Sequence, residues 1–214
     1  MARTAGSDGE KTEAALREAA AQLIARHGFE AVTMRQLAAE VGVQAAALYR
    51  YFPSKEDLLF KLMRDHMDGL AEALEAALPA HGDPRARLEA FIANHVRFHV
   101  ERRHATHVSN MELRSLSRDH LSEILRLRSA YEKELRAILR DGQDAGVFAV
   151  DDVALTSMAI IQMITGVIVW FRPDDRLSIE DVTTKYQTMT MRLAGALAAE
   201  EKRHVPPLHE IRAR

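Results

Sequence analysis

Apolar residues recur at intervals of three and four along almost the whole chain, which is the spacing of one face of an α-helix. The first such run includes Leu16, Ala19, Leu23 and Ile24 and ends at Gly28. Comparable runs predict further helices at about 33–42, 44–51, 54–78, 84–101, 105–114, 118–142, 151–171 and 178–201. The only strand candidate is the short VFAV segment at 147–150. The pattern therefore predicts an all-α protein.

Two short helices joined by a glycine turn are predicted in TMRQLAAEVGV and the segment that follows it. Thr33 and Gln36 have the spacing of a capping box, and Gly42 suits the left-handed end of a helix. The second helix stops before Pro53. This is the layout of a helix-turn-helix, which inserts its second helix into the major groove of DNA. An αα-hairpin in an ordinary bundle has the same pattern, so the spacing alone leaves both interpretations open.

The segment LYRYFPSKEDLL, at residues 48–59, follows directly. Together with TMRQLAAEVGV at 33–43, it resembles the TetR-type family of bacterial transcriptional repressors. The resemblance implies a three-helix helix-turn-helix domain at the N-terminus, followed by an all-helical ligand-binding and dimerisation domain. The expected division is a disordered tail at 1–10, a DNA-binding domain at 11–53, a ligand-binding and dimerisation domain at 54–202, and a tail at 203–214.

The same resemblance implies which side chains contact DNA. Leu48 and Phe52 would be core residues, and the polar side chains around them would face the phosphates. The implied phosphate contacts are Thr33, Tyr49, Tyr51 and Lys55.

Base contacts are expected from the start of the second helix, at Gln44, Ala45 and Ala46, helped by Arg35. A glutamine pairs with the edge of adenine, and an alanine methyl group can meet the methyl group of thymine. Many family members have Ser or Thr where this chain has Gln44, and often Gly where it has Ala47. The operator sequence therefore does not follow from the resemblance.

The charge balance supports a local rather than a global interaction with DNA. The whole chain has a formal net charge of −2, whereas many proteins that bind polyanions are basic. Residues 33–55 carry Arg35, Arg50 and Lys55 against Glu40, a net charge of +2. A dimer doubles this charge and matches a palindromic operator with half-sites about one helical turn, or a multiple of it, apart.

The helix predicted at 151–171 is apolar around its whole circumference, and the helix at 178–201 has one apolar side. One side of the first can face the core of its own chain, and a partner subunit would cover the other. The alternative is a monomer that buries both sides. The expected dimer interface consists of Leu155, Ile160, Ile164, Val167, Phe171, Tyr186, Met189 and Leu193.

Soft apolar side chains in the C-terminal two-thirds suggest a cavity for a small hydrophobic ligand, although plain core filling explains each of them equally well. The expected lining residues are Met63, Met67, Phe91, Phe98, Met111, Arg114, Arg118, Met158, Met163, Gln162 and Trp170. A ligand there would tilt the helix at 54–78, which joins the two domains, and would lower operator affinity.

The segments at 110–139 and 166–182 look like the branch of the family that responds to acyl-CoA thioesters in fatty-acid, steroid or related catabolism. A neutral hydrophobic effector fits the composition as well. For a thioester, Arg114, Arg118, Arg128, Arg172 or Arg176 would meet the phosphates.

Other classes of protein find little support. The chain has no cysteine and no phosphate-binding loop, GxSxG or HExxH motif, so we expect neither an enzyme nor a cofactor. His95 and His99 have the spacing of a metal-binding pair, but solvated or hydrogen-bonded histidines are the default. No metal is expected. An all-helical ligand carrier or interaction protein without a DNA role is the competing class.

The start of the chain, MARTAGSDGEKTEAA, has no apolar segment typical of a secretory signal, so a cytoplasmic, bacterial protein without a membrane partner is expected. Residues 153–171 are uncharged, and a transmembrane span needs about 20 apolar residues. A buried core helix has the same composition, and the polar residues in this segment favour that interpretation.

Overall fold

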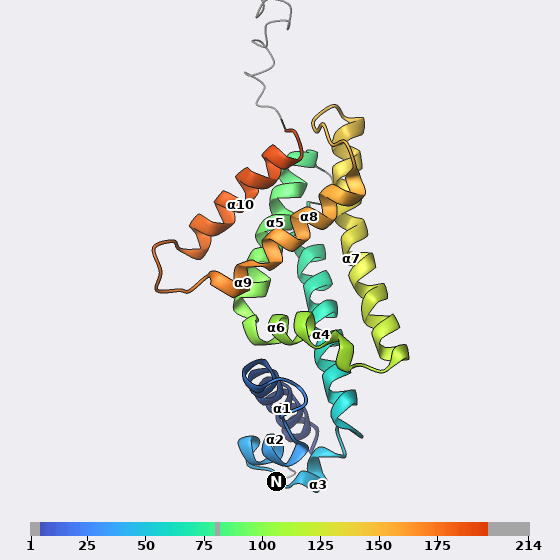
Figure 1. The fold of residues 1–214 in the computed structure, drawn as a ribbon, viewed down its shortest axis with the longest axis vertical. Coiled ribbons are helices and arrows are strands. Elements are labelled where there is room, and N and C mark those ends of the chain that lie inside the picture. Colours follow the sequence, from blue (N-terminus) through green and yellow to red (C-terminus); the bar gives the residue numbers. More distant parts are fainter. Residues whose placement is uncertain (1–4, 80–81, 197–214) are drawn as a thin grey trace, which may run out of the picture.

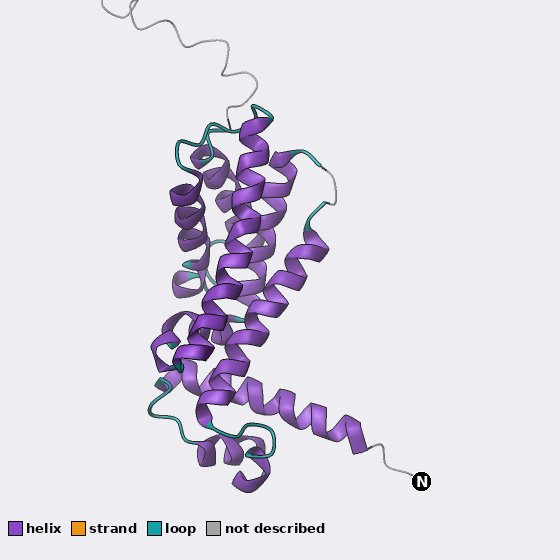
Figure 2. Ribbon diagram, turned by 90° about the vertical axis from the view of Figure 1, so that its right-hand side faces the viewer, coloured by secondary structure: helices purple, strands orange, loops and turns teal. Residues whose placement is uncertain are grey.

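The computed structural model describes residues 5–79 and 82–196, and all regular structure in these ranges is helical (Figures 1 and 2). In chain order the helices are α1 (Ala5–His27), α2 (Met34–Val41), α3 (Ala45–Leu48), α4 (Lys55–Ala77), α5 (Pro84–Glu101), α6 (Arg103–Met111), the 3-10 helix η1 (Leu113–Ser115), α7 (Arg118–Asp144), α8 (Val153–Thr165), α9 (Val167–Trp170) and α10 (Ile179–Leu193). The all-α prediction is confirmed.

Two predictions about chain segments are wrong. VFAV at 147–150 forms no strand but connects α7 to α8, and it is apolar because Phe148 and Val150 are buried against the core. Helix α1 begins at Ala5, so residues 5–10 of the predicted disordered tail are helical. The predicted tail at 203–214 lies outside the described residues.

Helices α1, α2 and α3 pack with the first turns of α4 into a small unit, the head, at the lower end of Figure 1. Leu16, Leu37, Leu48 and Leu58 are completely buried at its centre, and Phe52 is nearly so. Leu48 and Phe52 are therefore core residues, as predicted. Val108 of α6 and Ile124 of α7 also belong to this core, so the head is packed against the rest of the molecule.

The remaining helices form a larger unit, the body, in which the second half of α4 packs with α5, α7, α8, α9 and α10. Phe91, Ile92, Leu135, Ile160 and Val167 are completely buried there. Figure 2 shows the long helices of the body running roughly side by side, with the head at one end. Helix α10 makes its largest contact with α5, which lies at the centre of the body.

Helix α4 passes through both units and confirms the predicted connecting helix. It starts at a serine cap, since Ser54 Oγ accepts a hydrogen bond from Asp57 N at 3.0 Å. Leu58, Leu59 and Leu62 belong to the core of the head, whereas Leu70 and Leu74 belong to the core of the body. The two units therefore share one rigid element.

Candidate nucleic-acid interface and effector region

The turn between α2 and α3 has the geometry that a helix-turn-helix requires. Thr33 caps α2, with Gln36 N donating to Thr33 Oγ1 at 3.2 Å and Thr33 N donating to Gln36 Oε1 at 2.8 Å. Gly42 ends α2 with a φ of 73°, in the left-handed region that glycine adopts without strain. Val43 N then donates to Ala38 O at 2.9 Å, which fixes the start of α3 relative to α2.

Four of the predicted DNA contacts lie exposed at this edge of the head. Thr33, Arg35 and Gln44 are exposed at the starts of α2 and α3, and Ala46 is exposed on α3. Gln44 makes no capping hydrogen bond with its side chain, which leaves its amide group available to an external partner. Ala45 is only half exposed, because it also packs against the core of the head.

The two tyrosines differ in exposure. Tyr49 is 51% exposed, which places its hydroxyl group at the surface next to α3. Tyr51 is half-buried and packs against the core, with its ring centroid 6.5 Å from that of Phe52. The ring of Tyr51 therefore helps to pack the head, in addition to any contact that its hydroxyl group makes.

Lys55 has internal partners that the sequence did not reveal. Its ammonium group donates to Phe29 O at 2.9 Å and to Val32 O at 3.1 Å, and it lies 4.1 Å from the centre of the Phe29 ring. These contacts hold the loop between α1 and α2 against the start of α4. The Lys55→Ala substitution would therefore remove support from the head as well as a positive charge from its surface.

The predicted effector-pocket residues do not converge on one cavity. Met63 belongs to the core of the head, whereas Met67, Phe91 and Phe98 fill the core of the body, with the half-buried Met163 packed against it. The others are exposed on different helices: Met111, Arg114, Arg118, Met158, Gln162 and Trp170. Helical spacing identified apolar faces correctly but could not tell a cavity wall from a packed core. The predicted lining residues therefore lie in two cores and on separate surfaces of this structure, and the effector pocket stays a prediction.

A cavity of about 680 Å³ lies between α4 and α7. Its apolar lining includes Met67, Leu74, Leu127 and Tyr131, of which only Met67 was predicted. Its charged lining residues are Asp68, Glu75, Glu134 and Arg87, and the guanidinium group of Arg87 pairs with Asp141 at 2.6 Å. The volume suits a small hydrophobic molecule, and the excess of carboxylates disfavours phosphate groups at this mouth.

A network of polar groups links the Tyr131 side of this cavity to α5 and α8. Tyr131 Oη lies 3.2 Å from His95 Nδ1, and His95 Nε2 lies 2.9 Å from Thr165 Oγ1. The His99 ring stacks on the His95 ring at 3.8 Å, and its Nδ1 donates to His95 O at 2.8 Å. Both ring nitrogens of His95 thus have protein partners.

Several polar atoms around this network have no hydrogen-bond partner. Among the described residues they are His66 Nδ1, Ser109 Oγ and Arg128 Nε. The guanidinium group of Arg128 donates to Ser109 O at 2.6 Å and to Asn110 Oδ1 at 3.2 Å, both of them neutral acceptors. A buried donor without an acceptor destabilises a fold by about 1–3 kcal/mol, so this part of the body is arranged to receive hydrogen-bond acceptors.

Burial keeps the histidines of this network neutral. It is the main cause that lowers the pKa of His66 to about 3, and the neighbouring charge of His99 lowers it further. Burial also lowers the pKa of His99 to about 4 and that of His95 well below its usual value. The same cause raises the pKa of Tyr131 and lowers that of Arg128.

One other group of possible metal ligands occurs among the described residues, at Glu56, Asp57 and His120. Its atoms already bond to one another and to the start of α4: Glu56 Oε1 lies 2.8 Å from His120 Nδ1, and Asp57 Oδ2 accepts from Ser54 Oγ at 2.6 Å. These bonds tie α4 to the start of α7.

The predicted dimer interface is only partly exposed. Ile160, Ile164, Val167, Phe171 and Tyr186 are buried in the body of their own chain, whereas Leu155, Met189 and Leu193 are exposed. Met158, Val169 and Trp170 join the exposed set, and Val169 is 73% exposed. We call the six exposed residues the apolar face: Leu155, Met158, Val169, Trp170, Met189 and Leu193. The sequence missed Val169 as a member of this face and assigned Met158 and Trp170 to the ligand pocket.

Residues Val153–Trp170 are long and apolar enough to cross a membrane by length and composition, but only 28% of them are buried within the chain. Some of these apolar side chains are buried in the core of the body, and much of the rest belong to the apolar face.

Two family models match the chain. The model described as "Bacterial regulatory proteins, tetR family" covers residues 16–62, and the model described as "Tetracyclin repressor-like, C-terminal domain" covers residues 81–194. The chain belongs to the TetR family of transcriptional regulators. The first match spans most of the head and the start of α4, and the second spans most of the body.

Individual relatives agree with this membership. The HTH-type transcriptional repressor KstR2 of Rhodococcus jostii is 25% identical over 190 residues, covering 88% of this chain and 92% of that protein. The TetR family transcriptional regulator PfmR from Thermus thermophilus has a TM-score of 0.77 at 36% identity, covering 83% of this chain and 97% of that one. AibR, solved in complex with isovaleryl coenzyme A and operator DNA, shares the fold with a TM-score of 0.77 at 24% identity, covering 87% and 100% of the two chains.

The buried histidines predict a specific dependence of stability on pH. The pKa of His66 is about 3 in the folded chain and near 6.5 when unfolded, so the unfolded state takes up a proton first as the pH falls. The free energy of unfolding should therefore be highest above pH 6.5 and should decrease as the pH falls from there towards pH 4. His66→Leu removes this titrating group. The slope of the free energy of unfolding against pH, measured by urea unfolding, should therefore become smaller by roughly 1.4 kcal/mol per pH unit.

The exposed His104 provides the matched control, because His104→Gln removes a histidine without removing a buried one. Its slope should equal that of the unsubstituted chain. An unchanged slope in His66→Leu would show that His66 is not kept neutral by the fold.

Proposed function

We propose that this chain is a dimeric repressor that binds a palindromic DNA operator and is released from it by a small hydrophobic effector. The observation that carries the proposal is the exposed edge of α2 and α3, where a capped helix start, an arginine, a glutamine and a tyrosine lie side by side around an otherwise well-packed head. A ligand carrier would have no need for this arrangement. The proposed role is regulatory and not enzymatic.

Recognition of DNA would divide between backbone and bases. Thr33, Tyr49 and the start of α2 would contact phosphates, because hydroxyl groups and free helix amides bind phosphate oxygens without regard to sequence. Gln44 and Ala46 would face base edges, where glutamine favours adenine and the methyl group favours thymine. Arg35 would add positive charge at the edge of the groove. Tyr51 and Lys55 would make additional contacts beside it, although Tyr51 also packs, and Lys55 also forms hydrogen bonds, within the head.

Dimerisation would be mediated by the apolar face. Met158, Trp170, Met189 and their neighbours lie on α8, α9 and α10, and this surface carries six large apolar side chains. A two-fold interface would bury it and set the distance between the two heads. A soluble, cytoplasmic dimer explains the apolar composition of α8 and α9 without a membrane.

The effector would bind in the body, where the α4–α7 cavity adjoins the polar network. The cavity supplies apolar walls, and Tyr131, which lines it, brings a hydroxyl group that belongs to the polar network. An acyl-CoA thioester offers both an apolar chain and a carbonyl oxygen, and the AibR complex contains such a ligand. Its phosphate groups would have to lie outside the mouth of the cavity, which is lined by carboxylates. Because Met67 and Leu74 of α4 line the cavity, the bound effector would displace α4 and change the spacing of the heads.

The proposed division of the chain follows from this scheme. Residues 11–53 would form the DNA-binding domain and residues 54–202 the effector-binding and dimerisation domain, with α4 as the element that transmits the change.

The combined substitution Arg35→Ala and Tyr49→Phe should weaken operator binding by roughly 30-fold or more, because each lost phosphate or groove contact is worth about 1–2 kcal/mol. The slope of log affinity against log salt should become smaller by about one, for the single charge removed. Fluorescence anisotropy with a selected operator duplex measures both quantities. Arg97→Ala removes an exposed arginine of α5 and should change neither. Equal affinity of the double variant and the unsubstituted chain would contradict the proposal.

Met189→Glu should convert the dimer into monomers, since it places a charge in a desolvated apolar interface, and the dimer dissociation constant should rise by about tenfold or more. Met111→Glu is the matched control, because Met111 is 58% exposed on α6, outside the apolar face, compared with 50% for Met189. Sedimentation equilibrium distinguishes the species. A Met189→Glu variant that stays dimeric would show that the interface lies elsewhere.

A further inference from the structure

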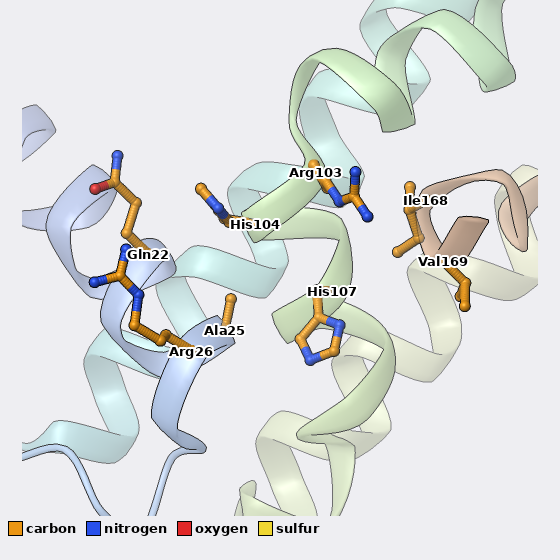
Figure 3. Close-up of a pocket in the computed structure, with 8 residues that line it drawn as sticks. All are labelled: Gln22, Ala25, Arg26, Arg103, His104, His107, Ile168 and Val169. Carbon is orange, nitrogen blue, oxygen red and sulfur yellow. The ribbon is translucent and has the colours of Figure 1, made fainter. Parts of the chain in front are cut away.

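A second pocket, separate from the α4–α7 cavity, lies where the head meets the body. It has a volume of about 430 Å³ and lies among α1, α6 and α9 (Figure 3). Its polar lining consists of Gln22 and Arg26 from α1 and of Arg103, His104 and His107 from α6. Ile168 and Val169 of α9 form an apolar wall at one side. We call it the junction pocket.

Positive charge is concentrated at this pocket. Arg103 Nη1 donates to Phe171 O at 2.9 Å, and Arg172 Nη1 donates to the same oxygen at 2.9 Å. Two guanidinium groups thus converge on one neutral carbonyl group, while Arg26 lines the opposite side of the pocket on α1, with its guanidinium group beside Gln22. Burial is the main cause that lowers the pKa of Arg103, and the nearby charge of Arg172 lowers it further, as expected for like charges held close together.

Among the residues that the structure describes, the lining of the junction pocket includes no carboxylate to balance these charges. Two acidic side chains near it already have partners: Glu18 Oε1 accepts from Gln22 at 2.8 Å, and Glu101 pairs with Arg102 at 3.1 Å. An arrangement of several cations around an open volume, without internal counter-ions, favours a multiply charged anion.

The operator is not the natural partner of this pocket. Figure 1 shows α6 on the side of α1 that faces the body, whereas α2 and α3 lie on the opposite side of α1. Phosphates of a duplex bound along α3 would therefore not reach Arg103 or Arg172. The size of the pocket and its apolar wall suit a small molecule instead.

We propose that the junction pocket binds the diphosphate group of a small molecule, with Arg26, Arg103 and Arg172 as the main ligands and His104 and His107 as further donors. Arginine presents parallel N–H donors that match phosphate oxygens, and two phosphoryl groups can engage arginines from both walls. The apolar wall formed by α9 leaves room for an organic group attached to the diphosphate. This site goes beyond the proposed effector function, because it does not involve the α4–α7 cavity.

Binding there would add a shared ligand to three elements that already pack against one another. Arg26 belongs to the head, Arg103 to the body, and Arg172 follows α9, which carries part of the apolar face. A bound diphosphate would fix the angle between head and body and thereby favour one spacing of the two heads. The junction pocket would act as a second control point on the same equilibrium.

Isothermal titration calorimetry of the full chain with inorganic pyrophosphate tests the proposal at constant ionic strength. Arg26→Gln removes an exposed side chain and should weaken binding about tenfold or more, and Arg172→Gln should act similarly. Arg140→Gln, an exposed arginine of α7 remote from the pocket, is the matched control and should bind like the unsubstituted chain. Thermal melting of each variant verifies that it is folded.

A parallel titration with ADP distinguishes the source of the diphosphate. Tighter binding of ADP than of pyrophosphate would support an organic diphosphate, and equal binding would support the phosphate chemistry alone. The proposal is overturned if pyrophosphate does not bind, or if Arg26→Gln and Arg172→Gln bind it as well as Arg140→Gln does. None of these results depends on whether an effector releases the operator.

Discussion

A single helix, α4, contributes buried side chains to two hydrophobic cores at once. Leu58, Leu59 and Met63 are completely buried in the head, and Leu70 and Leu74 are buried in the body only two to four turns further along. Neither core can shift along this helix without disturbing the other, because packed interiors change between discrete arrangements and not continuously. His66 lies between the two sets, packed against the rings of Phe98 and His99. The polar network of the body therefore adjoins α4 where the two cores meet, and the proposed effector acts at that point.

The body uses its apolar residues in two ways that composition cannot separate. Ile160 and Ile164 of α8 face α5 and the core, while Leu155 and Met158 of the same helix face outwards. A helix that is apolar all round must be covered on both sides. The chain itself covers one side, and in the proposed dimer a second subunit covers the other, so the position of the heads would depend on the packing of α8, α9 and α10.

The sequence predicted best those features that depend on neighbouring residues. Capping, glycine turns and helix starts are local, so Thr33, Gly42 and Ser54 were identified correctly, as were the buried positions Leu48 and Phe52. Features that depend on distant segments were not predictable. Lys55 bonds to carbonyl groups of the loop after α1, Tyr131 and Thr165 fix His95 from α7 and α8, and Ile160 faces inwards because of where α5 lies. Periodicity shows that a helix has an apolar face, but only the fold shows whether that face meets the core, a cavity or a partner.

The proposed role in DNA binding can be measured by selecting the sequences that the full chain binds from random double-stranded DNA. We expect enrichment of a near-palindromic site with half-sites about one helical turn, or a multiple of it, apart, and loss of that enrichment in the Arg35→Ala and Tyr49→Phe double variant. The selected site should be bound less tightly as salt increases. Failure to enrich any sequence, or enrichment that is the same for the double variant, would contradict the account.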